Sequence, residues 1–128
     1  MALYRLLYVG NDLEFLNILR KILTKPRCHI VYCPHIGSAI LFLKGNPRYD
    51  LLMIDLELDG KRRGIELARI TRSISHRADL PVVIMTNETI NNLYLLNYHS
   101  VVNAWLSKRK ISACSEIIIP LLKSGHQQ

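Results

Sequence analysis

The feature that most constrains the fold is a regular alternation of short apolar runs with longer helical segments. Five runs of strand length are predicted at residues 4–9, 28–33, 49–55, 81–86 and 101–107. The segments that follow them are predicted to be helices at residues 13–25, 36–43, 65–74, 88–98 and 111–122. Such alternation is typical of an α/β fold in which helices cover both faces of a parallel sheet. We therefore predict a flavodoxin-like (βα)5 three-layer sandwich with strand order 2-1-3-4-5.

The composition is that of one globular domain. The chain has 128 residues, of which 49% are hydrophobic and 21% charged, so the disordered class is excluded. We expect a single domain over residues 3–123 and a disordered tail over residues 124–128. No apolar run has the length of a membrane span, and the three cysteines match no zinc-binding spacing. A cytoplasmic protein with reduced thiols and no membrane contact is expected.

A chemical site is predicted from the residues at which three strands end. Asp55 closes a run that is apolar on both faces, Thr86 closes the fourth predicted strand, and Lys108 follows the fifth. The carboxyl ends of parallel strands share one edge of the sheet, where ligands bind in open α/β folds. A carboxylate, a hydroxyl and an ammonium at one edge suit phosphoryl chemistry. Asp55 would be the nucleophile, and the other two would stabilise the phosphoryl oxygens.

With these residues the chain resembles the receiver domain of two-component response regulators. The resemblance extends from Tyr4 to about Leu122 and depends on YDLLMIDLELDG around Asp55, VVIMT ending in Thr86 and AWLSK ending in Lys108. It implies that Asp55 accepts a phosphoryl group from a histidine kinase and that Thr86 and Lys108 bind that group. It also implies a switch made of Thr86 and the aromatic residue three positions before the lysine, which is Trp105 in this chain.

The chain departs from this family where a metal ion is expected. Receiver domains carry an acidic pair after the first strand that holds Mg²⁺, and here those positions are Gly10 and Asn11. Magnesium requires octahedral oxygen ligation and is usually held through carboxylates. Asn11, Asp55 and the backbone carbonyl of Glu57 remain as candidate ligands, so we expect Mg²⁺ binding to be weak or absent. Asp12, Glu57 or Glu88 is left open as a partial replacement for the missing carboxylates.

Two further departures concern the loops at this edge. Arg109 stands where the family usually has a proline, so the loop after the fifth strand is expected to be less constrained. One extra residue lies between Asp55 and Gly64, which lengthens the loop over the site. A purely structural interpretation stays open as well. Asp55 and Lys108 would then be a residual ion pair that tethers two strands, and Thr86 would satisfy a backbone group.

The net charge of +7 allows an anionic partner. Two basic clusters, Lys61 to Arg63 and Lys108 to Lys110, are predicted to lie at the edge near Asp55, while most other basic residues are expected on the solvated surface. No nucleic-acid-binding motif accompanies them, so a nucleic-acid partner is not expected. The predicted fourth helix carries little charge, and Ile117 to Leu122 is apolar throughout. We expect a protein partner or a homodimer to bind the fourth helix, fifth strand and fifth helix.

Together these features predict a stand-alone, atypical receiver domain in bacterial two-component (phosphorelay) signalling. It would act through conformation-dependent protein binding, with phosphorylation of Asp55 possible but impaired. The alternative is a phosphorylation-independent adaptor that binds an anionic ligand or nucleic acid through the basic rim. An enzyme is not expected, because no general base, general acid or cofactor loop accompanies Asp55.

Overall fold

The computed structural model describes residues 3–25, 27–88 and 98–125. Its centre is a five-stranded parallel sheet with strand order β2-β1-β3-β4-β5, as predicted. The strands are β1 (Tyr4–Val9), β2 (Cys28–Cys33), β3 (Leu51–Asp55), β4 (Val82–Thr86) and β5 (Ala104–Ser107). The α-helices among the described residues are α1 (Leu13–Ile22), α2 (Ile36–Lys44), α3 (Gly64–Ser73) and α5 (Cys114–Gly125). Two 3-10 helices complete the described elements, η1 (Ser75–Arg77) and η2 (Lys108–Ala113).

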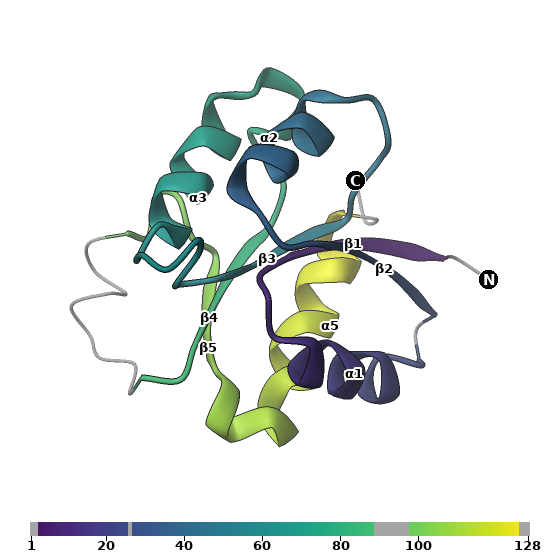
Figure 1. Cartoon of the computed structure of the whole chain (residues 1–128). Coiled ribbons are helices and arrows are strands. Elements are labelled where there is room, and N and C mark those ends of the chain that lie inside the picture. The colour runs from purple at the N-terminus through teal and green to yellow at the C-terminus, as the bar shows by residue number, and fades with distance from the viewer. Residues whose placement is uncertain (1–2, 26, 89–97, 126–128) are drawn as a thin grey trace.

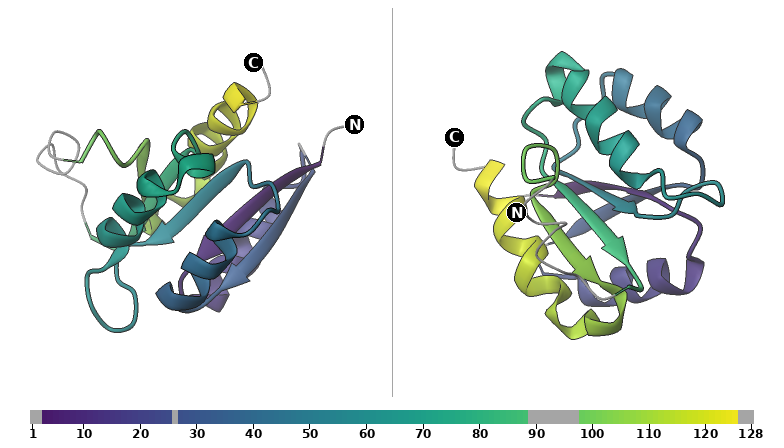
Figure 2. Two further views of the ribbon diagram at one scale, coloured as in Figure 1. Left: turned by 90° about the horizontal axis from the view of Figure 1, so that it is seen from above. Right: turned by 90° about the vertical axis from the view of Figure 1, so that its left-hand side faces the viewer.

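The helices form the outer layers of a three-layer sandwich. Helices α2 and α3 lie on one face of the sheet, and α1 and α5 lie on the other (Figures 1 and 2). Strand β3 lies between β1 and β4, and all five of its residues are buried. Both of its faces are covered, which explains why its sequence is apolar without alternation. The predicted flavodoxin-like (βα)5 architecture is therefore confirmed.

Two apolar cores flank the sheet, and successive side chains of each strand point alternately into one core and the other. Leu52 and Ile54 point into the core on the α2 and α3 side. Leu51 and Met53 point into the core on the α1 and α5 side. Because side chains alternate along a strand, Asp55 belongs to the same face as Leu51 and Met53. The face on which Asp55 lies determines which neighbouring side chains its carboxylate can reach.

The loop between β3 and α3 contains a tight turn. The backbones of Leu58 and Lys61 exchange hydrogen bonds in both directions, at 2.7 and 3.0 Å. The two residues between them have positive φ angles, 53° at Asp59 and 76° at Gly60. Asp-Gly is a preferred pair for such two-residue turns, since both residues tolerate the left-handed region. The longer loop predicted over the site is thus an ordered turn.

Several element boundaries differ from the prediction. Helix α1 ends at Ile22 instead of residue 25, and buried Leu23 follows it as the C-cap. The last helix was predicted from residue 111, but that segment begins with η2, which has a non-helical residue at Lys110, and α5 starts at Cys114. Helix α5 includes Pro120 and continues to Gly125, two residues into the segment expected to be a tail. The predicted fourth helix falls largely on residues 89–97, outside the described residues. Among the described helices, none has the length and apolar character needed to cross a bilayer.

Candidate functional site

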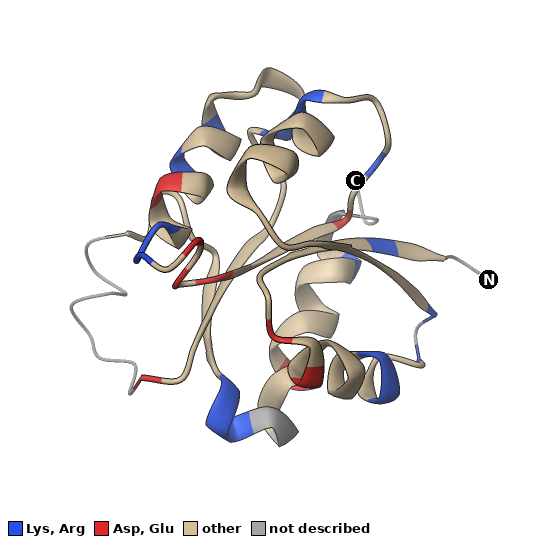
Figure 3. Cartoon of the chain, viewed as in Figure 1, with Lys and Arg blue, Asp and Glu red and all other residues tan. Residues whose placement is uncertain are grey.

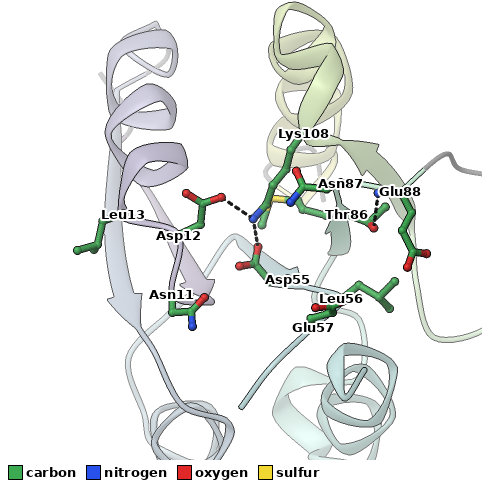
Figure 4. A pocket seen from close by; sticks show the side chains of 11 residues that line it. Asn11, Asp12, Leu13, Asp55, Leu56, Glu57, Thr86, Asn87, Glu88 and Lys108 are labelled. Atoms are coloured by element: carbon green, nitrogen blue, oxygen red, sulfur yellow. Dashed lines mark hydrogen bonds and ion pairs between the residues drawn. The ribbon is translucent and has the colours of Figure 1, made fainter. Parts of the chain in front are cut away.

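The carboxyl edge of the sheet brings five predicted site residues around one cavity. The cavity has a volume of about 380 Å³, and its lining includes Asn11, Asp55, Glu57, Thr86 and Lys108 (Figure 4). These residues come from the loops and strand ends that follow β1, β3, β4 and β5. The convergence that the sequence predicted for Asp55, Thr86 and Lys108 is therefore present. The sixth predicted residue, Trp105, does not line this cavity.

Lys108 joins two carboxylates at the bottom of the cavity. Its Nζ lies 3.1 Å from Asp55 Oδ1 and 3.0 Å from Asp12 Oδ2 (Figure 4). The lysine side chain is only 10% exposed, and Nζ also lies 5.0 Å from the centre of the Phe15 ring. An ammonium with two anionic partners and little solvent contact is held firmly in place. Lys108 is thus the cation of this site among the described residues.

Asp12 has two roles at the start of α1. It is the N-cap residue, and its Oδ1 accepts a 2.9 Å hydrogen bond from the backbone N–H of Phe15. Its other oxygen, Oδ2, faces Lys108. Burial acts to raise the pKa of Asp12, but the Phe15 N–H and Lys108 outweigh it and hold that pKa below its ordinary value. Asp12, which the sequence left open as a replacement carboxylate, therefore does reach the site.

Tyr8 supplies a contact that the sequence did not predict. Its hydroxyl donates a 2.8 Å hydrogen bond to Asp55 Oδ2 and accepts a weaker one, at 3.4 Å, from the backbone N–H of Asp12. Burial and the neighbouring Asp55 carboxylate raise the pKa of Tyr8 well above its ordinary value. The phenol is therefore a neutral donor throughout the physiological pH range. The sequence signal that was available is strand alternation, which places Tyr8 two residues before Gly10 on the face that Asp55 shares.

Asp55 is nearly buried, at 5% exposure. Burial raises its pKa above the ordinary value, while the Lys108 ammonium and the Tyr8 hydroxyl oppose that rise. Both carboxylate oxygens are engaged from within the chain, Oδ1 by the ammonium and Oδ2 by the phenol. The carboxylate lies at the right edge for nucleophilic chemistry, but Oδ2 accepts the phenol hydrogen bond, and Oδ1, which accepts no hydrogen bond from the described residues, is held by its ion pair with Lys108.

The two predicted switch residues lie on the other face of the sheet. Thr86 is buried, and its hydroxyl accepts a 3.0 Å hydrogen bond from the backbone N–H of Glu88. Trp105 is 7% exposed, packs in the core on the α2 and α3 side, and has its ring centre 6.2 Å from that of Tyr98. The switching role of Thr86 and Trp105 stays a prediction.

The residues around Asp55 do not fit a magnesium site. A Cβ atom at Gly10 would lie 2.2 Å from Asp55 Oδ2, so the position of the first acidic residue is filled by the Asp55 carboxylate itself. Asn11 and Glu57 are exposed at the rim of the cavity. Among the described residues there is no group of three or more His, Cys, Asp or Glu side chains arranged for a metal ion. The cation between the buried carboxylate of Asp55 and the half-buried carboxylate of Asp12 is instead Lys108.

The predicted basic rim is partly neutralised by acidic neighbours. Arg62 pairs with Glu88, Arg63 pairs with Glu66, and Lys108 pairs inside the cavity. Figure 3 shows basic residues on the loop before α3 and on η2, with acidic residues along the same edge. Glu88, which the sequence left open as a replacement carboxylate, thus forms its ion pair with Arg62. The rim offers less free positive charge than its sequence indicated.

The apolar sequence of α5 is mostly covered. Ile118 and Leu122 are buried, and Ile117, Ile119 and Leu121 are half-buried. The exposed large hydrophobic side chains among the described residues lie elsewhere, at Leu3, Leu13, Leu41 and Phe42. The predicted partner surface thus retains only half-covered apolar residues on α5, and its fourth-helix part lies outside the described residues.

Comparison with curated proteins gives one relative in sequence. No family model matches the chain. Stress response regulator protein 1 from the yeast Meyerozyma guilliermondii is 34% identical over 91 residues, which are 70% of this chain. The chain spans about two fifths of that relative's length, since 41% of it is matched. Because this relative is a yeast protein, it does not support the expectation of a bacterial chain.

Solved structures with the same fold are numerous, and several are receiver domains. A response regulator from Chloroflexus aurantiacus has a TM-score of 0.81 at 19% identity, with 95% of this chain and 99% of the other covered. A receiver-domain protein from Methanospirillum hungatei has a TM-score of 0.76 at 20% identity and covers 98% of each chain. The receiver domain of a sensor histidine kinase from Pseudomonas aeruginosa, which holds a magnesium ion in its active-site cleft, has a TM-score of 0.77 at 16% identity, covering 95% and 99%.

Proposed function

Since this chain has the fold of response-regulator receiver domains, we propose that it is an atypical receiver domain in two-component signalling that acts through conformation-dependent protein binding. Asp55 is the proposed phosphoacceptor, and Thr86 and Lys108 are the proposed contacts of the phosphoryl oxygens. Phosphorylation at Asp55 is impaired in this proposal. The curated relative is named a stress response regulator, so stress signalling is the proposed context.

The observation that carries the proposal is the closed set of contacts around Asp55. Asp55 lies at the carboxyl edge of the sheet, with one carboxylate oxygen hydrogen-bonded to Tyr8 and the other ion-paired with Lys108. An incoming phosphoryl dianion would meet two carboxylates, Asp55 and Asp12, with one ammonium between them. In phosphoryl transfer, metal ions normally neutralise this developing charge. The arrangement therefore supports a receiver that transfers phosphoryl groups slowly.

The proposed partners are proteins. A histidine kinase is the proposed phosphodonor, and the output surface is proposed to include β5 and α5. Half-covered Ile117, Ile119 and Leu121 leave apolar area on α5 that a partner or a second copy would cover. The adaptor alternative receives less support, because Arg62, Arg63 and Lys108 are each paired with acidic side chains.

The test is incubation with acetyl phosphate and Mg²⁺ followed by intact mass measurement. We expect the phosphoryl adduct to form at least about 100-fold more slowly than on a receiver domain that has its acidic pair. A bound metal ion supplies several kcal/mol of transition-state charge stabilisation, and each ~1.4 kcal/mol is a factor of ten in rate. The Pseudomonas aeruginosa receiver domain serves as the positive control.

Two variants assign any adduct that does form. Asp55→Asn should abolish it, whereas Asp79→Asn, which changes an exposed aspartate elsewhere, should not. Rapid formation of an adduct that depends on Asp55 would refute the impairment while keeping Asp55 as phosphoacceptor. An adduct that persists in Asp55→Asn would refute the assignment of the site.

A further inference from the structure

Asp55 and Tyr8 fill the space over Gly10. A Cβ atom added at Gly10 would lie 2.2 Å from Asp55 Oδ2, 2.5 Å from Asp55 Cγ and 2.6 Å from the Tyr8 hydroxyl. Contacts shorter than 3.0 Å are not tolerated by real Cβ atoms. The absence of a side chain at Gly10 is therefore a steric requirement of this arrangement. Any larger residue there must displace the carboxylate.

Two contacts hold Asp55 in that place. The Tyr8 hydroxyl donates to Oδ2 at 2.8 Å, and the Lys108 ammonium lies 3.1 Å from Oδ1. Lys108 also lies 3.0 Å from Asp12 and so occupies the space between the two carboxylates. A divalent ion bound to both carboxylates would have to compete with this ammonium.

Tyr8 is itself fixed by its surroundings. It is fully buried, at 0% exposure, and its ring packs edge-on against Phe15 with the centres 6.1 Å apart. On another side the ring centre of Tyr32 lies 5.9 Å away. A phenol packed in this way presents its hydroxyl in one direction with little freedom to turn. Its hydrogen bond to Asp55 is thus built into the core.

We propose that Tyr8 is a positioning residue that holds Asp55 over Gly10 and thereby excludes a divalent cation from the site. The loss of the acidic pair is then only one of two reasons why a divalent cation is excluded from the site. A carboxylate restored at residue 11 remains without effect as long as the Tyr8 hydroxyl holds Asp55 over Gly10. The inference deepens the proposed function, because it concerns the same carboxylate.

The test measures Mg²⁺ binding by isothermal titration calorimetry, with no phosphodonor present. The key comparison is between Asn11→Asp, which adds a carboxylate at an exposed position and leaves Gly10 intact, and Tyr8→Phe/Asn11→Asp. Tyr8→Phe removes only the hydroxyl and keeps the ring in the core. The matched control is Tyr32→Phe/Asn11→Asp, which removes the same atom from the neighbouring ring. Asp55→Asn added to Tyr8→Phe/Asn11→Asp should abolish the binding if the ion binds at this site.

We expect Tyr8→Phe/Asn11→Asp to bind Mg²⁺ at least about tenfold more tightly than Asn11→Asp, because Asp55 no longer has to break a buried hydrogen bond before it can ligate the ion. Tyr32→Phe/Asn11→Asp should bind like Asn11→Asp. Equal affinity with and without the Tyr8 hydroxyl would overturn the proposal, as would tight, Asp55-dependent binding to the unaltered chain.

Far-UV circular dichroism checks that each variant folds. If either member of the first pair does not fold, Asn11→Glu with and without Tyr8→Phe is the second pair. Equal affinities in this pair would also overturn the proposal. Because acetyl phosphate is absent, failure here is separate from failure of the phosphorylation test.

Discussion

Replacing Lys108 with methionine is expected to lower the free energy of unfolding by about 3–5 kcal/mol at neutral pH, because it leaves the Asp55 carboxylate buried without its cation. Asp55 is 5% exposed, and Lys108 is its partner on Oδ1. Asp12 loses the same partner but keeps its hydrogen bond from the Phe15 N–H. Methionine preserves the length and apolar stem of lysine, so the loss reports mainly on charge. Urea denaturation at several pH values measures it.

The deficit should shrink as the pH falls, for a reason that follows from the pKa shifts. Burial raises the folded-state pKa of Asp55, and Lys108 opposes that rise, so removing Lys108 raises this pKa further. A carboxyl group whose pKa is higher in the folded state is protonated first in that state. Its destabilising effect therefore grows as the pH rises through the window between the unfolded and folded pKa values. The contribution that Lys108 makes through Asp12, whose pKa is held low, is likewise lost at acid pH.

Lys61→Met is the matched control, because Lys61 is exposed. Surface substitutions of this kind change stability by about 0.5 kcal/mol or less. A Lys108→Met variant as stable as this control, or one whose deficit is the same at pH 5 and pH 8, would show that the ammonium does not compensate a buried charge. Either result would also contradict the interpretation that Lys108 neutralises the charge of the Asp55 carboxylate.

The sheet was predictable because its strands are short, apolar and regularly spaced. β3 is apolar on both faces, and this alone indicates an interior strand of a parallel sheet. The rule that ligands bind at the carboxyl ends of parallel strands then predicts that Asp55, Thr86 and Lys108 lie together at one edge of the sheet. Asp12 as the cap of α1 was also predictable from its residue type. These inferences depend only on local pattern and on connectivity.

The helix ends and the contacts of Tyr8 were not predictable in the same way. Leu23 continues the helical apolar pattern, yet it leaves the helix as its C-cap and is buried there by tertiary packing. The segment after β5 forms η2, and the ammonium of its first residue, Lys108, lies against Asp55 and Asp12, a long-range contact that local pattern does not reveal. In the sequence, Tyr8 looks like any other aromatic residue of a strand. Its role depends on the absence of a side chain at Gly10, which leaves room for the Asp55 carboxylate and the Tyr8 hydroxyl.

Arg77 is a second residue whose role the sequence did not reveal. Basic side chains were expected on the solvated surface, but Arg77 is 5% exposed. Its guanidinium donates to the backbone carbonyls of Leu43, Gly45 and Pro47, around the end of α2. It also lies 4.9 Å from the centre of the Tyr49 ring. Arg77 thus satisfies carbonyls of Leu43 and Gly45, at the end of α2, which the helix leaves without intrahelical partners, and a third carbonyl in the loop that follows.

Arg77→Met is therefore expected to lower the free energy of unfolding by about 3 kcal/mol, because each buried carbonyl left unsatisfied costs about 1–3 kcal/mol and water reaches some of them. Arg77→Lys should recover less than half of that loss, since an ammonium lacks the planar fork that serves several acceptors at once. Arg20→Met on the exposed face of α1 is the matched control and should change stability by about 0.5 kcal/mol or less. Thermal and urea denaturation measure all three. If Arg77→Lys were as stable as the unaltered chain, the planar fork would not be what stabilises the end of α2, and a positive charge alone would account for the contribution of Arg77.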